Sequence, residues 1–266
     1  MTSSGYETIA VRKEGRATVV TLNRPEQLNV LDPLMCDELV AAAGRATADG
    51  SNVLVLGGSG RIFCAGVDLD THYFPDGVGD SPFTAVASLD EQHNLIQTIY
   101  DLPMVTIAAV NGDAIGGAGF GMAMACDLRY AVRDARFWLV ASSFDVTQDY
   151  GLSWLLQRQI GMSRTMEMAF TGRRVDAITG EVWGFVNGVL KDRDALNERV
   201  RQVSAGIAEM GPEAAQLMKH VIRAGATSTL SDQLKLESVA NGLCFQSEGF
   251  RAARSALRSR LGKETT

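Results

Sequence analysis

Two short apolar runs, each followed by a glycine-rich segment, restrict most strongly what this chain can fold into. VLVLGG at 53–58 precedes FCAGVDL at 63–69, and VTIAAV at 105–110 leads directly into NGDAIGGAG at 111–119. Short apolar runs that end in glycine are typical of buried strands. The second glycine segment continues into an apolar helical stretch, and this order of elements favours a parallel sheet in an α/β fold.

Helical spacing fills the intervals between the predicted strands. It covers 32–48, where Asp32 followed by Pro33 forms a good helix start, and 86–101. Two further strands are expected at 7–11 and 16–22, on either side of a turn. Residues 70–85, rich in Gly, Pro and Asp, are expected to form either a mobile loop that flanks a site or a plain surface loop.

The strand pattern stops near residue 192. Beyond it lie four amphipathic helix candidates, at 192–209, 212–224, 230–245 and 248–260. We therefore expect two regions, a core at 1–191 and a helical C-terminal subdomain at 192–266. Amphipathic helices of this kind often pack against a neighbouring subunit.

Composition narrows the functional classes. The net charge of -6 argues against a nucleic-acid groove, which needs a basic stripe. Neither an apolar signal core at the N-terminus nor an apolar stretch of about 18 residues is present, so a secreted or membrane-spanning protein is not expected. The four cysteines are widely spaced and form no CxxC pair, which favours reduced thiols in a cytoplasmic protein over a disulfide scaffold or a zinc site.

Glycines at a junction between a strand and a helix allow backbone N–H groups to bind a carbonyl oxygen. They let the backbone approach a ligand closely, and the start of the helix presents N–H groups that have no partner within the helix. Two such N–H groups, one from each segment, would stabilise negative charge that develops on a carbonyl oxygen. Either segment alone is also what a plain turn looks like, and the second fits neither a dinucleotide fingerprint nor a Walker loop.

Taken together, several motifs resemble the enoyl-CoA hydratase/isomerase (crotonase) superfamily in order and spacing. They are RPEQLN at 24–29, FCAGVDL at 63–69, AAVNG at 108–112, CDLRYA at 126–131, TGRRVDA at 171–177 and WGFVNGV at 183–189. The resemblance covers about residues 7–260. It implies an α/β crotonase-like spiral core of repeated ββα turns with a helical C-terminal trimerisation region. It also implies a homotrimer or homohexamer that binds acyl-CoA, with no metal or cofactor beyond the coenzyme A of the thioester substrate.

The resemblance also implies which residues form the site. The backbone N–H groups of the oxyanion hole fall on Val67 and Gly117. The chain has one residue more than the family pattern between Asn111 and Cys126, so counting back from Cys126 gives Ala118 instead. Residues expected near the substrate are Arg24, Ala65, Gly66, Asp68, Phe120 and Ala141.

Hydratases of this family use two glutamates, one to accept and one to donate a proton. Their positions fall here on Phe120 or Gly121 and on Ala141, so this chain departs from the hydratase pattern at both. The remaining acid is Asp149. Its segment, DYGLSWLL at 149–156, resembles a DxGxSxLL segment in which the aspartate shuttles a proton, although Gln148 replaces the usual proline.

A single carboxylate beside an oxyanion hole is enough for an enoyl-CoA isomerase, which is the function we expect. Asp149 could instead be a surface residue or a helix cap. His93 has a counterpart near the acyl pocket in the family, and a His–Asp pair occurs in 4-chlorobenzoyl-CoA dehalogenase, where we expect a tryptophan at the position of Ala141. For a lone histidine such as His93, however, the favoured interpretation is a hydrogen-bonded packing residue.

Other functions and other residue roles stay open. The alternatives are a hydratase-like, dehalogenase-like or hydrolase-like activity on an acyl- or aryl-CoA, and a non-catalytic acyl-CoA-binding member. Arg24 could approach the coenzyme A phosphates or serve only at the surface. Asp68 and Asp127 are interpreted as structural, the first capping a helix and the second buried and hydrogen-bonded.

Overall fold

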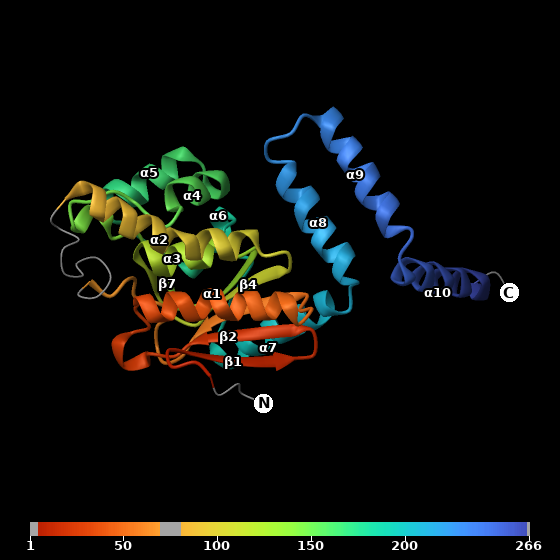
Figure 1. Cartoon of the computed structure of the whole chain (residues 1–266), viewed down its shortest axis with the longest axis horizontal. Helices are drawn as coiled ribbons and strands as arrows, with labels where there is room; N and C mark the ends of the chain where they lie inside the picture. Colours follow the sequence, from red (N-terminus) through yellow and green to blue (C-terminus); the bar gives the residue numbers. More distant parts are fainter. Residues whose placement is uncertain (1–4, 70–80, 265–266) are drawn as a thin grey trace.

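The computed structural model describes residues 5–69 and 81–264 and contains two sheets (Figure 1). The larger sheet has the strand order β1-β2-β3-β4-β6-β9. Its strands are β1 (Ile9–Glu14), β2 (Ala17–Leu22), β3 (Val53–Gly58), β4 (Val105–Val110), β6 (Leu128–Val132) and β9 (Gly188–Leu190). Only β1 runs antiparallel to its neighbour, so the expectation of mostly parallel pairing is confirmed.

The smaller sheet contains three strands in the order β5-β7-β8. They are β5 (Ala114–Ile115), β7 (Arg136–Trp138) and β8 (Arg174–Asp176). Because β5 lies between β4 and α3 (Gly116–Ala125), the second glycine segment passes from one sheet to the other before its helix begins.

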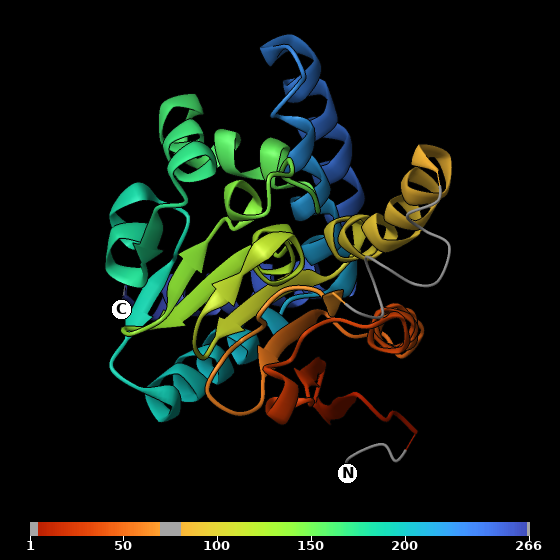
Figure 2. The same cartoon turned by 90° about the vertical axis from the view of Figure 1, so that its left-hand side faces the viewer.

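Helices cover both faces of the larger sheet (Figure 2). Side chains alternate between two apolar clusters, with Leu54 and Leu56 in one and Val53 and Val55 in the other, as the pleat of a strand requires. The first cluster includes residues of α1 (Pro33–Ala48), α2 (Pro82–Asp101) and α3. The second is closed by α7 (Arg193–Ala208).

The starts of two helices test the sequence prediction. The side chain of Asp32 accepts a hydrogen bond from the Met35 N–H at 2.8 Å, so it caps α1 as expected. In contrast, α2 starts at Pro82 rather than at 86, because Ser81 caps it and Pro82 is preorganised for the first turn. Of the loop expected at 70–85, residues 70–80 lie outside the described residues, and residues 82–85 belong to α2.

Three short α-helices lie between β7 and β9 in the sequence. These are α4 (Leu152–Ile160), α5 (Met162–Thr171) and α6 (Ala177–Trp183). The last three helices are α8 (Pro212–Ala224), α9 (Leu230–Cys244) and α10 (Glu248–Glu264), which extend away from the sheet (Figure 1). The four expected C-terminal helices are thus present, but α7 packs on the sheet rather than with the others. In the described part of the chain, no helix is long and apolar enough to cross a membrane.

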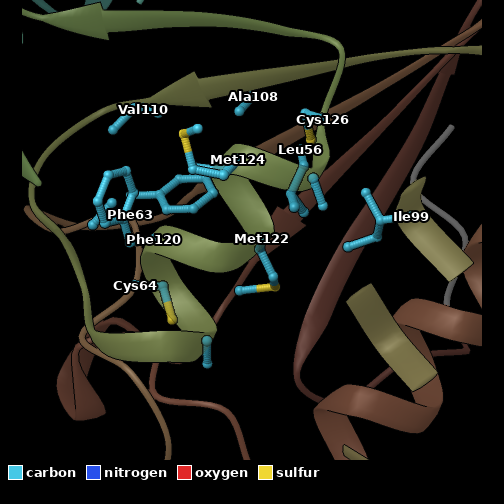
Figure 3. Close-up of a cluster of buried hydrophobic side chains, with 14 of the residues drawn as sticks. Leu56, Phe63, Cys64, Ile99, Ala108, Val110, Phe120, Met122, Met124 and Cys126 are labelled. Atoms are coloured by element: carbon cyan, nitrogen blue, oxygen red, sulfur yellow. The ribbon is translucent and has the colours of Figure 1, made fainter. Parts of the chain in front are cut away.

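Helix α3 runs through the core. Nine of its ten residues are buried, and the exception is Gly117 in its first turn. Its side chains Phe120, Met122 and Met124 lie among apolar residues of neighbouring elements, with Phe63 and Val110 close to Phe120 (Figure 3). The helix therefore has a rigid, dry environment along its length, and only its N-terminal turn can meet a ligand.

Candidate active site

The two glycine segments meet at the N-terminal end of α3. Ile115 donates its N–H to the Cys64 carbonyl at 2.9 Å, which joins the segments as neighbouring strands. Gly66 and Gly116 both have positive φ, of 112° and 67°. A Cβ on Gly116 would lie 3.7 Å from the Gly66 Cα, so the two loops approach each other backbone to backbone.

The direction of the Val67 N–H follows from its neighbours. The Gly66 carbonyl accepts a hydrogen bond from the Leu31 N–H at 2.9 Å. In a trans peptide the C=O and the following N–H point in opposite directions. The Val67 N–H therefore points away from Leu31, and Val67 is half-buried rather than enclosed.

The second N–H group of the expected oxyanion hole is assigned to Gly117, with Ala118 as the alternative. Both lie in the first turn of α3, where the N–H groups have no acceptor within the helix. Ala118 is completely buried, whereas Gly117 is partly exposed. Only an accessible residue can present its N–H to a ligand, so the geometry favours Gly117.

Asp149 lies directly against this helix start. A Cβ on Gly117 would lie 1.7 Å from the Asp149 Oδ1 atom and 2.7 Å from its Cγ atom. The carboxylate thus occupies the space beside Gly117 that any side chain would fill. Asp149 is half-buried and ends the segment that precedes α4, so it is neither a fully exposed surface residue nor buried in the core.

His93 comes from α2 and lies beside the residue after Asp149. Its Nε2 atom accepts a hydrogen bond from the Tyr150 N–H at 3.4 Å, and the two rings meet edge to face with centroids 5.4 Å apart. The structure therefore brings His93 and Asp149 into one neighbourhood. The hydrogen bond of His93 is made to the backbone that carries Asp149.

The first position where hydratases carry a glutamate, which falls on Phe120 or Gly121, is enclosed. Phe120 is completely buried and packs on Phe137 and Phe185, with ring centroids 5.1 and 5.8 Å away. The expectation that Phe120 contacts the substrate is therefore corrected, because its side chain turns into the core. A Cβ on Gly121 would lie 2.8 Å from the Tyr150 carbonyl oxygen, which leaves no room for a glutamate.

Ala141 and Ala65 border the glycine loops. Ala141 begins the short 3-10 helix η4 (Ala141–Ser143) and is 9% exposed. The preceding Val140 side chain would lie 3.4 Å from a Cβ on Gly116, which places η4 next to the second loop. Ala65 donates its N–H to the Leu28 carbonyl at 3.1 Å and is half-buried, next to Gly66.

Arg24 is engaged by the protein itself. Its guanidinium lies 2.9 Å from the Asp32 carboxylate and 3.6 Å from that of Asp68, and it donates to the Val30 carbonyl. Two carboxylates neutralise this cation, and its side chain is 19% exposed. Arg24 and Asp68 therefore tie the start of α1 to the first glycine loop. The expectation that Asp68 caps a helix concerns residues 70–80, which lie outside the described residues.

Two asparagines that the sequence analysis gave no role support the first loop. Asn29 is buried and donates its amide N–H groups to the carbonyls of Ser59, Ile62 and Phe63. Asn111 accepts from the Gly58 N–H and donates to the Gly60 carbonyl. Both belong to motifs that carry the family resemblance, and their side chains replace water around a turn that must stay fixed.

The far end of α3 is capped by a buried cation. Arg129 donates through Nη1 to the carbonyls of Ala123, Met124 and Cys126, which are among the last acceptors of the helix. Burial lowers the pKa of Arg129 to about 10, so the group remains charged at neutral pH. A positive charge there offsets the negative end of the α3 dipole.

Comparison with known proteins agrees with this architecture. The sequence model described as "Enoyl-CoA hydratase/isomerase" matches residues 12–260. The chain belongs to the enoyl-CoA hydratase/isomerase family. Within this crotonase family, the chain is 36% identical to a protein named "Probable enoyl-CoA hydratase" from Rhodobacter capsulatus, over 92% of this chain and 93% of that protein. It is 31% identical to 1,2-epoxyphenylacetyl-CoA isomerase from Escherichia coli, over 98% of both.

Solved structures of the crotonase family show the same fold. An enoyl-CoA hydratase subunit I from Geobacillus kaustophilus superposes with a TM-score of 0.87 at 31% identity and covers 97% of each chain. An enoyl-CoA hydratase from a Polaromonas species gives a TM-score of 0.87 at 29% identity, over 95% of this chain and 97% of the other. The chain is thus an acyl-CoA enzyme with the crotonase fold of two sheets and a helical C-terminal region.

Proposed function

We propose that this crotonase-family enzyme is an enoyl-CoA isomerase that moves a double bond with a single aspartate. The observation that carries the proposal is the position of the Asp149 carboxylate against Gly117, at the start of α3. Both positions of the hydratase glutamates hold enclosed, non-acidic residues. One carboxylate is therefore available to transfer a proton where the two-glutamate mechanism needs a pair.

The proposed reaction keeps all atoms of the substrate. The N–H groups of Val67 and Gly117 bind the thioester oxygen of a 3-enoyl-CoA, and Asp149 removes a proton from C2. The electron pair of that C–H bond is delocalised as a dienolate, whose negative charge the two N–H groups stabilise. Asp149 then returns the proton to C4, which leaves the double bond between C2 and C3.

Hydration is the second candidate, because several relatives are named as enoyl-CoA hydratases. The enclosed side of Gly121 opposes it, since no carboxylate can be seated there to handle the water. A dehalogenase-like reaction through His93 is supported less well, because His93 bonds to the Tyr150 N–H and Ala141 is small.

Ultraviolet absorbance distinguishes isomerisation from hydration. Incubated with 3-enoyl-CoA, the wild-type protein should raise the absorbance as the double bond becomes conjugated with the thioester carbonyl. Incubated with crotonyl-CoA, it should lower the absorbance slowly or not at all, because hydration removes that conjugation. Fast loss of crotonyl-CoA absorbance with no change in 3-enoyl-CoA would reverse the assignment.

Assembly into trimers or hexamers belongs to the same proposal. Helices α8 and α9 carry apolar side chains that the chain does not cover, which include Ile222, Leu230, Val239 and Leu243 at 69%, 75%, 62% and 59% exposure. Large exposed apolar side chains grouped on one region favour a partner surface. The partner we propose is a second copy of the chain.

A further inference from the structure

We propose that Tyr150 is a positioning residue that holds the Asp149 carboxylate at the start of α3 by anchoring its backbone to α2. The inference rests on the proposed function, since that function gives Asp149 the proton-transfer role. Tyr150 itself is completely buried and cannot touch the substrate. Its effect on the reaction must therefore act through Asp149.

Both ends of Tyr150 are bonded to successive residues of α2. Its hydroxyl lies 3.1 Å from the Gln92 Oε1 atom, and its N–H donates to the His93 Nε2 atom at 3.4 Å. Gln92 is 9% exposed and donates in turn to the Ser88 hydroxyl at 3.2 Å, which orients its amide. Two bonds to one rigid helix fix both the main chain and the ring of Tyr150.

Two glycines of α3 form the surface on which Asp149 and Tyr150 rest. Gly117 and Gly121 are four residues apart and therefore lie on one face of the helix. A Cβ on Gly117 would lie 2.7 Å from the Tyr150 Cδ2 atom, and one on Gly121 would lie 2.9 Å from the Tyr150 Cβ atom. The turn is thus held between α2 and a face of α3 that carries no side chains.

The backbone of this turn needs such support. Tyr150 has φ of 50° and Gly151 has φ of 72°, both in the left-handed region. That region is unfavourable for a residue with a Cβ atom, and it persists where surrounding contacts enforce it. The left-handed pair directs Leu152 into the core, where it is completely buried, while Asp149 stays beside Gly117.

The test follows the Asp149 carboxyl group itself. Protein labelled with ¹³C at the aspartate carboxyl carbon is compared for wild type, Tyr150→Phe and Gln92→Met, and Asp149→Asn identifies the Asp149 signal by its loss. Tyr100→Phe is the matched control, because Tyr100 belongs to α2 itself and its ring contacts Trp154 and Arg223 rather than the turn at 149–151. At fixed pH the signal should shift or broaden in the two test variants and stay in place in the control.

Kinetics give a second readout. In both test variants, kcat for a 3-enoyl-CoA should fall about tenfold while KM stays within a few-fold, because a small misplacement of a catalytic group costs rate more than binding. The inference is overturned if the Asp149 signal keeps its wild-type position in Gln92→Met and in Tyr150→Phe. If the wild type does not isomerise 3-enoyl-CoA, the proposed function fails, and the carboxyl signal alone still decides whether Tyr150 positions Asp149.

Discussion

Individual residues in this chain decide between chemistries that share one fold. In the proposed function, the two glycine loops bind the oxygen of the acyl-CoA enolate whatever the reaction. What differs is the acid–base group near them. Here a half-buried aspartate lies beside Gly117, and the space near Gly121 is filled by Tyr150. We therefore expect the proton-transfer group, rather than the residues that bind the thioester, to determine the reaction.

The role of Asp149 can be tested with an isosteric change. Asp149→Asn keeps the shape and removes the base, so turnover of a 3-enoyl-CoA should fall by roughly 10²–10⁴, the usual contribution of a general base. Acyl-CoA affinity measured by calorimetry should stay within a few-fold, because in the proposed function backbone N–H groups, and not Asp149, bind the thioester oxygen. His93→Ala should lower turnover less, by about tenfold, if His93 only orients the turn. Equal losses at the two positions would favour a coupled His–Asp mechanism.

Glu38 on α1 provides a pH-dependent contribution to stability. Its carboxylate accepts hydrogen bonds from the N–H groups of Glu7 and Thr8 and from the Thr8 hydroxyl. Burial would raise the pKa of Glu38, but these hydrogen bonds outweigh burial and hold the pKa below its usual value. A lowered pKa in the folded state means that the stabilisation is complete above the unfolded pKa and is lost as pH falls through the folded one.

Glu38→Gln should therefore lower the free energy of unfolding by about 1–3 kcal/mol at neutral pH. In urea titrations from pH 7 to about 3, the difference in the free energy of unfolding between variant and wild type should become smaller as the pH falls. Glu198→Gln, at an exposed ion pair on α7, is the control and should change little. A gap that stays constant across this range would show that the Glu38 carboxylate is not the stabilising species.

At the scale of elements, α3 combines core packing with the proposed roles in binding and catalysis. Its first turn supplies N–H groups, its glycine face seats the turn at 149–151, and Arg129 binds its last carbonyls. A helix of glycine, alanine and methionine suits this task, because small residues let the neighbouring backbones approach on several sides. The composition that weakens an isolated helix is tolerated because burial holds it in place.

Gly121→Ala tests whether the face of α3 formed by Gly117 and Gly121 holds the turn that carries Asp149. The added methyl group would meet the Tyr150 carbonyl and Cβ, so the turn that carries Asp149 must move. Overpacking of this kind should cost about 1–3 kcal/mol in the free energy of unfolding, with a loss of isomerase turnover. Gly206→Ala in α7, where a Cβ meets nothing within 4 Å, is the control and should stabilise by roughly 0.5–1 kcal/mol with unchanged turnover. Equal turnover in the two variants would contradict the inference that Gly117 and Gly121 hold the turn at 149–151 in place.

Elements with strong local patterns were predictable from the sequence, and contacts between distant segments were not. The amphipathic C-terminal helices and the Asp32 cap follow from spacing and capping chemistry. The direction of Phe120 depends on how α3 rotates against both sheets, so its core position was missed. The bonds from Tyr150 to Gln92 and His93 join residues more than fifty positions apart, and no local pattern indicates them.

At the scale of the whole molecule, the Asp127 carboxylate connects the C-terminal helix α8 to the elements beside the candidate site. Asp127 follows α3 and pairs with Lys219 and Arg223 of α8, at 2.7 and 2.6 Å. It also accepts from the N–H and hydroxyl of Thr106, so the expected hydrogen bonding is confirmed, although Asp127 is half-buried rather than buried. Because Arg223 also donates to the Tyr100 carbonyl on α2, the orientation of α8 is set by the elements that flank the site.

This anchoring fixes how the exposed apolar side chains of α8 and α9 are presented to a second copy. Light scattering should give a mass three or six times that of the 28.5 kDa chain at micromolar concentration. The double variant Val239→Glu/Leu243→Glu should shift the mass toward the monomer, because burying two carboxylates in an apolar interface is costly without partners. Lys235→Glu changes the charge of the same helix at a polar, exposed position and should leave the mass unchanged. A wild-type chain that stays monomeric would show that these side chains are simply exposed, and a double variant that still assembles would place the interface elsewhere.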